Sequence, residues 1–332
     1  MKFSLPRVSF AKIRAGEYKR HLTAPLLVLL VFIFIRISGR IDTALTRENE
    51  YAAEILLQLL IFLFPAVVYL ILTGQNMQGK RIRVFGIGHL LLMFSALMVL
   101  LCGSLLLGLW LGGYETLTDG YDLYGVFVAK NDGSAGDVAY LILAYAFLPA
   151  VCEEFVFRSV LCAEYEKCGM VPAIVMPALF FAMLHFDFAH FPSLLLAGLV
   201  LSLTMYATRT VVASMIVHFL FNLTSVFGKP YYQTVYDLGG QAFFVFLVTA
   251  LFFLFSFIFC AEAARLYRHY AMKNYSSGYA EELQPQDVPE DSKDTLAQYR
   301  ARHPRIFAAI SAFLSPTALI CYVFYVAVIL LF

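Results

Sequence analysis

Long apolar stretches separated by short polar segments run through most of the chain. A helix that crosses a bilayer needs roughly 17–25 mostly apolar residues. Nine stretches come close to this requirement, and each predicts one helix: Leu22–Ser38, Ala52–Leu72, Ile87–Leu111, Val138–Lys167, Val171–Asp187, Phe191–Ala207, Val211–Phe227, Gln241–Leu266 and Ile306–Phe332. The pattern predicts an all-α fold, a polytopic transmembrane helical bundle with about 8–9 spanning helices.

Composition supports this class. The 332 residues are 61% hydrophobic and 14% charged, and their mean hydropathy is +0.76. Soluble domains are about 45–50% apolar and about 25% charged, so a soluble fold of this size cannot bury so much apolar surface. The composition excludes a soluble enzyme and a disordered chain, and the net charge of +1 gives no field that attracts nucleic acid.

The cysteines indicate neither disulfides nor a zinc knuckle. Six cysteines are scattered in or beside apolar stretches, and no two form a C-x-x-C pair. We therefore expect buried free thiols.

Basic residues predict the orientation, because Lys and Arg are in excess in cytoplasmic loops. When nine spans are threaded, three basic segments fall on one side: residues 1–21, residues 80–83 and residues 265–273. The loop from Gly112 to Asp137, on the other side, is acidic. These segments predict a multi-pass plasma-membrane protein with a cytoplasmic amino terminus.

Charged side chains inside apolar spans are costly, and they are candidates for function by default. The fourth span carries Glu153, Glu154 and Arg158. The fifth ends at His185, and the seventh contains His218 and Asn222.

Helical spacing assigns different surroundings to the two adjacent acids. Glu154 and Arg158 are four residues apart and share one face, so they are expected to form an ion pair. Glu153 lies about 100° away around the helix and lacks that partner. This division into a paired acid and a free acid or base is typical of catalytic carboxylates.

The hairpin formed by the fourth and fifth spans allows the depths of Glu153 and His185 in the membrane to be compared. Glu153 lies sixteen residues before Gly169 and His185 sixteen residues after it. Both are about 24 Å from the turn along their helices, so they can meet. His218 is only about 14 Å from the turn near Arg209, which leaves a gap of about 10 Å that spacing alone does not close.

Two chemistries suit these residues. Glu153 and His185 can draw a proton from water, while His218 and Asn222 donate hydrogen bonds to a developing oxyanion. This reaction hydrolyses an acyl bond without a cofactor. Alternatively, Glu153, His185 and His218 bind zinc and leave one position open for water.

The motifs Glu153-Glu154-x-x-x-Arg158, Phe181-x-x-x-His185 and His218-x-x-x-Asn222, in this order on three spans, resemble those of the CAAX prenyl protease and bacteriocin-processing (Abi-like) family. The family comprises intramembrane endopeptidases related to type II CAAX prenyl endopeptidase. The resemblance covers about Ala144–Phe227. It implies that Glu153 with His185 activates water, that His218 and Asn222 form the oxyanion hole, and that Glu154 and Arg158 support the site.

These features divide the chain into six parts. Residues 1–21 form a basic cytoplasmic segment, 22–137 the amino-terminal spans, and 138–227 a catalytic core of four spans. The eighth span occupies 228–266, a hydrophilic cytoplasmic linker 267–305, and the last span 306–332.

The expected function is that of an intramembrane endopeptidase acting on a peptide or membrane-protein substrate within the lipid bilayer. A non-catalytic membrane immunity or partner-binding protein on the same scaffold is the alternative. Asp187 and His190 are expected to be solvated loop residues, and Glu54 is expected to lie at the membrane interface.

Overall fold

The computed structural model describes residues 22–40, 50–74, 81–112, 134–275 and 304–331, and these residues form helices joined by turns and loops, with no strand among them. The described elements in chain order are α1 (Ala24–Ser38), α3 (Glu50–Gln58), η1 (Leu59–Leu63), α4 (Phe64–Thr73), η3 (Ile87–His89), α5 (Leu90–Gly112), α8 (Ala135–Ile142), η4 (Leu143–Phe147), α9 (Leu148–Glu154), η5 (Phe155–Leu161), α10 (Cys162–Tyr165), η6 (Glu166–Cys168), α11 (Met170–Leu184), α12 (Phe191–Thr208), α13 (Val211–Phe227), α14 (Lys229–Tyr275), α16 (Pro304–Phe313) and α17 (Pro316–Leu331). The predicted all-α class is confirmed.

Five helices among the described residues are long and apolar enough to cross a membrane: Ala52–Thr73, Ile87–Gly112, Ala135–Cys168, Phe191–Thr208 and Lys229–Tyr270. Four shorter apolar helices accompany them, namely α1, α11, α13 and α17. The chain is therefore an integral membrane protein, whereas the count of eight or nine spans stays a prediction. The basic segment 1–21 and most of the acidic loop and of the linker lie outside the described residues.

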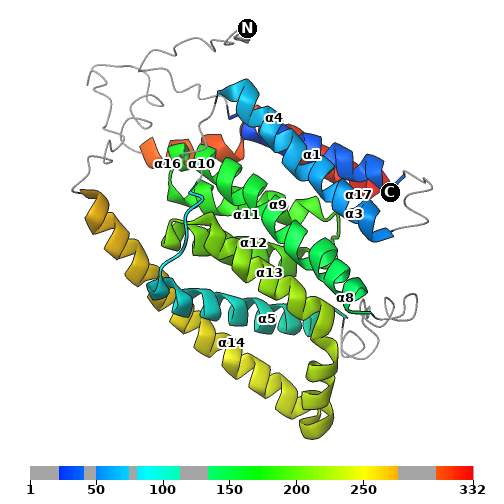
Figure 1. Cartoon of the computed structure of the whole chain (residues 1–332). Coiled ribbons are helices and arrows are strands. Elements are labelled where there is room, and N and C mark those ends of the chain that lie inside the picture. The colour runs from blue at the N-terminus through cyan, green and yellow to red at the C-terminus, as the bar shows by residue number, and fades with distance from the viewer. Residues whose placement is uncertain (1–21, 41–49, 75–80, 113–133, 276–303, 332) are drawn as a thin grey trace.

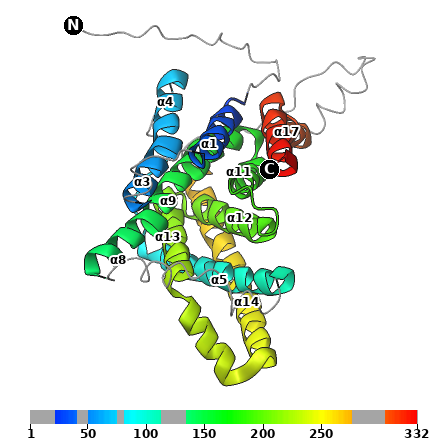
Figure 2. The same ribbon diagram turned by 90° about the vertical axis from the view of Figure 1, so that its right-hand side faces the viewer.

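The helices form three groups (Figure 1). The helices α9, α11, α12 and α13 occupy the centre, with α1, α4 and α17 on one side and α5 and α14 on the other. The view turned by 90° shows the same arrangement (Figure 2). Direct packing of α13 on α9 and of α11 on α12 places the elements that carry the candidate residues in the middle of the bundle.

Two of the predicted spans differ from the structure. The stretch Ile306–Phe332 was expected to be one helix, but it is broken into α16 and α17 at Pro316. Proline lacks an N–H and clashes with the preceding turn, and the Ser315 hydroxyl instead accepts a hydrogen bond from the Ala318 N–H. The eighth span lies within the longer helix α14, which turns sharply at Gly240 (φ 71°) and continues to Tyr275.

Prolines also explain two π-helical segments. In both η1 and η4 the last hydrogen bond spans five residues, from Phe64 N–H to the Leu59 carbonyl and from Leu148 N–H to the Leu143 carbonyl. In each case the next residue is a proline, Pro65 or Pro149, which cannot donate the following bond. The widened turn lets the helix continue through the proline as α4 or α9.

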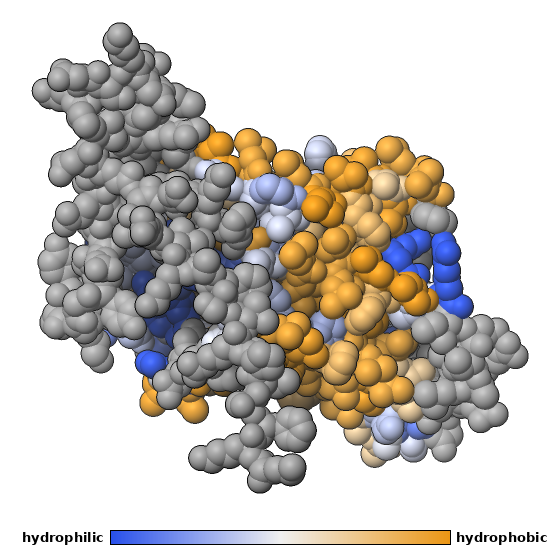
Figure 3. All heavy atoms as spheres, turned by 90° about the horizontal axis from the view of Figure 1, so that it is seen from above, coloured by the Kyte–Doolittle hydropathy of each residue, from blue (hydrophilic) through white to orange (hydrophobic). Residues whose placement is uncertain are grey.

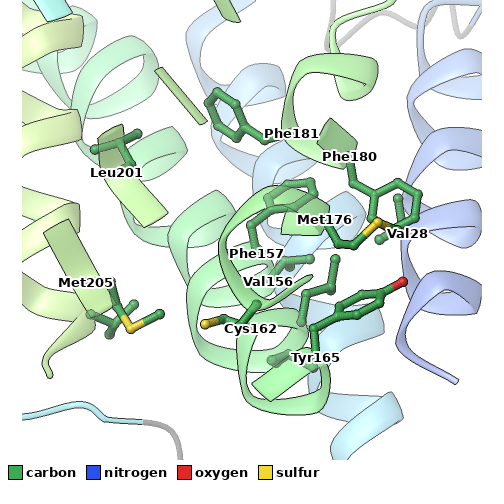
Figure 4. Close-up of a cluster of buried hydrophobic side chains, with 14 of the residues drawn as sticks. Val28, Val156, Phe157, Cys162, Tyr165, Met176, Phe180, Phe181, Leu201 and Met205 are labelled. Carbon is green, nitrogen blue, oxygen red and sulfur yellow. The ribbon is translucent and has the colours of Figure 1, made fainter. Parts of the chain in front are cut away.

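The core is a continuous apolar cluster beside the candidate site (Figure 4). Phe157 from η5, Met176 and Phe180 from α11 and Val28 from α1 lie close together there, and Leu201 from α12 belongs to the same cluster. The six cysteines are free, as predicted, and all but Cys260 are buried. Cys260 is exposed on α14, so the expectation of burial is wrong for this thiol.

Candidate active site

The two acids lie at the end of α9, between the π-helical segments η4 and η5. Pi-helical turns inside α-helices often mark functional positions because they redirect side chains. Glu154 is fully buried, and Glu153 is 7% exposed. Two adjacent carboxylates are thus held in the interior of the bundle.

Glu154 and Arg158 form the ion pair that their spacing predicts. The Arg158 Nη1 donates to Oε1 of Glu154 at 2.7 Å, and both side chains are fully buried. The Arg158 Nη2 donates to the carbonyl of Gly198 on α12 at 3.1 Å. The guanidinium also lies over the Phe181 ring, 4.5 Å from its centroid. Arg158 therefore ties the acidic helix to both α11 and α12.

His218 reaches the same carboxylate from α13. Its Nδ1 lies 3.0 Å from Oε1 of Glu154, and because an ionised carboxylate only accepts, Nδ1 is the donor. This contact shows that the gap of about 10 Å expected from helical rise is closed in space, although Glu154 lies about 22 Å from the Gly169 turn and His218 only about 14 Å from the turn near Arg209. The Gly169 turn and the start of α13 are therefore not level along parallel helices.

Glu153 has the different environment expected of the unpaired acid. Its Oε2 is buried and has no hydrogen-bond partner among the described residues. The carboxylate interacts electrostatically with His218, Glu154, Arg158 and Glu54. A buried carboxylate oxygen without a partner is costly, and it is available to accept a proton or a hydrogen bond from a bound molecule.

His185 follows the last residue of α11, and its side chain bonds back to that helix. Its Nδ1 donates to the Phe181 carbonyl at 3.0 Å, because a carbonyl oxygen only accepts. In a neutral imidazole, Nε2 is then an acceptor. The Phe181 ring separates the two histidines, with centroid distances of 5.2 Å to His185 and 5.6 Å to His218.

Of the two predicted residues on α13, the structure places His218 in contact with Glu154 but leaves the Asn222 side chain without a partner among the described residues. His218 bonds to Glu154 and interacts electrostatically with both Glu153 and His185. Asn222, one turn further along α13, is partly exposed, and its side chain makes no hydrogen bond within the described part of the chain. The shared oxyanion hole of Asn222 and His218 stays a prediction.

The candidate residues are not arranged as a set of zinc ligands. Among the described residues, no group of three or more His, Cys, Asp or Glu side chains is placed to share a metal ion. Glu153, His185 and His218 do not form such a group, and the Nδ1 atoms of both histidines are already occupied by protein acceptors.

Three participants were not assigned a role by sequence reasoning. The Phe181 ring and the Gly198 carbonyl contact Arg158, and Glu54 lies within electrostatic reach of Glu153. Phe181 and Gly198 are uncharged, and the sequence criterion for site residues was a charged or polar side chain inside an apolar span. Glu54 lay too far away along the chain for helical spacing to relate it to the site.

Asp187 and His190 lie in the loop between α11 and α12 and are well exposed, as expected for this pair. Partial burial favours the neutral form of Asp187, but the backbone N–H and the ring of His190 donate to its carboxylate. The hydrogen bonds prevail and hold the pKa of Asp187 below its ordinary value.

Comparison with known proteins relates this site to a protease family. Residues 135–224 match the family model described as Type II CAAX prenyl endopeptidase Rce1-like. The matched segment contains all six candidate residues, and it confirms the family resemblance for about a quarter of the chain. No curated protein and no solved structure matches the chain.

Proposed function

We propose that this chain is an intramembrane endopeptidase that hydrolyses a peptide bond of a membrane-associated substrate without a metal. The observation that carries the proposal is the buried cluster of Glu153, Glu154, Arg158 and His218 within the segment that resembles a protease family. Such a cluster is expensive inside a bundle, and a purely structural scaffold needs none of it.

The charges of this cluster balance when His218 is an imidazolium. Glu153 and Glu154 then carry two negative charges, and Arg158 and His218 carry two positive charges. Because Nδ1 of His218 donates to Glu154, only the imidazolium can also donate from Nε2. In the proposed reaction His218 is therefore the imidazolium, whose Nδ1 donates to Glu154 and whose Nε2 donates to the developing oxyanion.

In the proposed reaction, Glu153 accepts a proton from water while Nε2 of His185 accepts a hydrogen bond from the same molecule. The water oxygen bonds to the carbonyl carbon, and the carbonyl oxygen becomes an oxyanion. His218 and the Asn222 amide donate to this oxyanion. When the carbon–nitrogen bond breaks, Glu153 returns the proton to the leaving amine, which leaves an acid and an amine as products.

The first test is cleavage of a peptide library by purified, membrane-reconstituted protein. We expect defined cleavage products from the unaltered chain and almost none from Glu153→Gln, because an amide cannot accept the proton. The matched control is Glu262→Gln, which alters an acid on α14 that pairs with Arg265. A chain that cleaves nothing, or a Glu153→Gln variant that is fully active, refutes the proposal.

Metal dependence is tested separately. A glutamate that acts as a general base needs only water, so exhaustive treatment with a strong chelator is expected to leave the rate unchanged. Stoichiometric zinc in active protein, lost together with activity in Glu153→Gln and His185→Ala, would contradict the metal-free reaction. That result would favour the zinc alternative and leave the endopeptidase assignment intact.

A further inference from the structure

Phe186, the residue after His185, has an unusual backbone conformation. Its φ angle is 49°, in the left-handed region that bulky side chains rarely occupy. It is one of three non-glycine residues with positive φ among those described, and the other two are arginines. Strained residues persist only where the surroundings hold them, and they gather at functional sites.

Aromatic rings from two distant helices hold this residue. The Phe186 ring meets Phe32 of α1 edge-on at 5.3 Å and stacks on Tyr325 of α17 at 5.7 Å. Phe324 of α17 lies 6.5 Å away, and the Arg36 guanidinium of α1 lies 5.6 Å above the ring. Contacts of this kind stabilise beyond the area they bury, so together they can maintain the strained backbone.

The backbone at Phe186 also determines the position of His185. The Phe186 N–H donates to the Met183 carbonyl, which closes the last turn of α11 around His185. The His185 ring bonds to the Phe181 carbonyl in that turn. Because His185 and Phe186 share a peptide plane, anchoring the Phe186 ring also fixes where the His185 side chain begins.

We propose that Phe186 is a positioning residue for His185, and that α1 and α17 form part of the active-site framework through it. Both helices lie outside residues 135–224, the segment that resembles the protease family. The proposal rests on the endopeptidase function only in treating His185 as catalytic. Its structural part, the placement of the His185 ring, can be measured without any activity.

The test compares Phe186→Asn with Phe188→Asn in the full chain. Asparagine tolerates the left-handed conformation, so Phe186→Asn removes the ring contacts without adding backbone strain. Phe188 lies two residues further along the same loop and is 73% exposed, which makes it the matched control. We expect Phe186→Asn to lower kcat at least tenfold with KM within about twofold, and Phe188→Asn to change neither.

Spectra of protein labelled at histidine separate this proposal from the proposed function. The His185 resonances, assigned through His185→Ala, are expected to shift in Phe186→Asn and in Tyr325→Leu, but not in Phe188→Asn. Tyr325→Leu removes the aromatic ring that α17 stacks on Phe186. It replaces Phe186→Asn as the test variant if Phe186→Asn does not fold. Unchanged His185 resonances in the folded variants overturn the proposal, whereas an inactive unaltered chain refutes only the endopeptidase function.

Discussion

Arg158 is a fully buried guanidinium that connects three helices. It donates to Glu154 on its own helix and to the Gly198 carbonyl on α12, and it lies over the Phe181 ring on α11. Arginine suits this position because its planar fork donates in several directions while its face stacks on an aromatic ring. Its removal affects both the charge of Glu154 and the packing of the helices.

We therefore expect Arg158→Ala to destabilise the fold by about 3–5 kcal/mol, because the two buried carboxylates then share a single positive partner, His218. Thermal unfolding in a fixed detergent measures the change. The double variant Glu154→Gln/Arg158→Met is expected to recover most of the stability, since it removes both charges and glutamine can still accept from His218. Equal melting of the single and double variants is incompatible with a stabilising ion pair.

Asn222 offers a cleaner test of catalysis. Its side chain makes no hydrogen bond among the described residues, so Asn222→Ala should leave thermal unfolding nearly unchanged. If its amide donates to the oxyanion, turnover should fall by about 10²–10³ with little change in KM. The measurement is steady-state hydrolysis of a peptide that the unaltered chain cleaves, and an unchanged kcat removes Asn222 from the proposed oxyanion hole.

Sequence spacing predicted local relations and missed long-range ones. The Glu154–Arg158 pair followed from a separation of four residues on one helix. The bond from His218 to Glu154 did not follow, because it depends on how deep α13 starts relative to the Gly169 turn. The roles of Phe181 and Gly198 depend on which face of a neighbouring helix approaches, and hydrophobic periodicity does not specify this.

At the scale of elements, nearly uniform hydrophobicity limited the prediction. The apolar stretches located the helices well because length and composition suffice for that. They gave no sign of the π-helical segments η1 and η4 or of the break at Pro316, which depend on single prolines. The apolar stretch of the last predicted span continues across Pro316, so hydropathy alone could not reveal the break between α16 and α17.

The contact between α11 and α12 depends on a glycine. A Cβ built on Gly198 would lie 2.7 Å from both the Cα and the carbonyl oxygen of Ala178, so only glycine allows this approach. The Gly198 carbonyl also accepts from Arg158. Helix contact and active-site geometry are thus coupled at one residue.

Gly198→Ala is accordingly expected to separate α11 from α12 and to destabilise the fold by about 1–3 kcal/mol. Activity should fall along with stability because the Arg158 acceptor moves. Gly136→Ala is the matched control, since the nearest atom to its added Cβ is the Ser134 hydroxyl at 3.7 Å. Thermal unfolding and turnover of both variants check the prediction, and a Gly198→Ala variant as stable and active as the control contradicts it.

At the scale of the whole molecule, apolar side chains cover much of the surface. Seen from above, they form the larger part of the described face, with hydrophilic patches towards its ends (Figure 3). Five described helices are long enough to cross a bilayer, while α17 is among the shorter apolar ones. Its 16 residues are about 24 Å long against a hydrocarbon core of about 30 Å, so whether it crosses decides where the carboxyl terminus lies.

We expect α17 to cross. Charged residues are absent from Pro316–Leu331, and exposed apolar side chains such as Val323 and Leu330 suit a lipid environment. The distribution of Lys and Arg then places residue 293 in the cytoplasm and Phe332 outside. Reporter enzymes active on only one side of the membrane, fused after Lys293 and after Phe332 in two separate full-length chains, should give opposite signals. Identical signals would mean that α16 and α17 return the chain to the same face, and the nine-span topology would then be wrong.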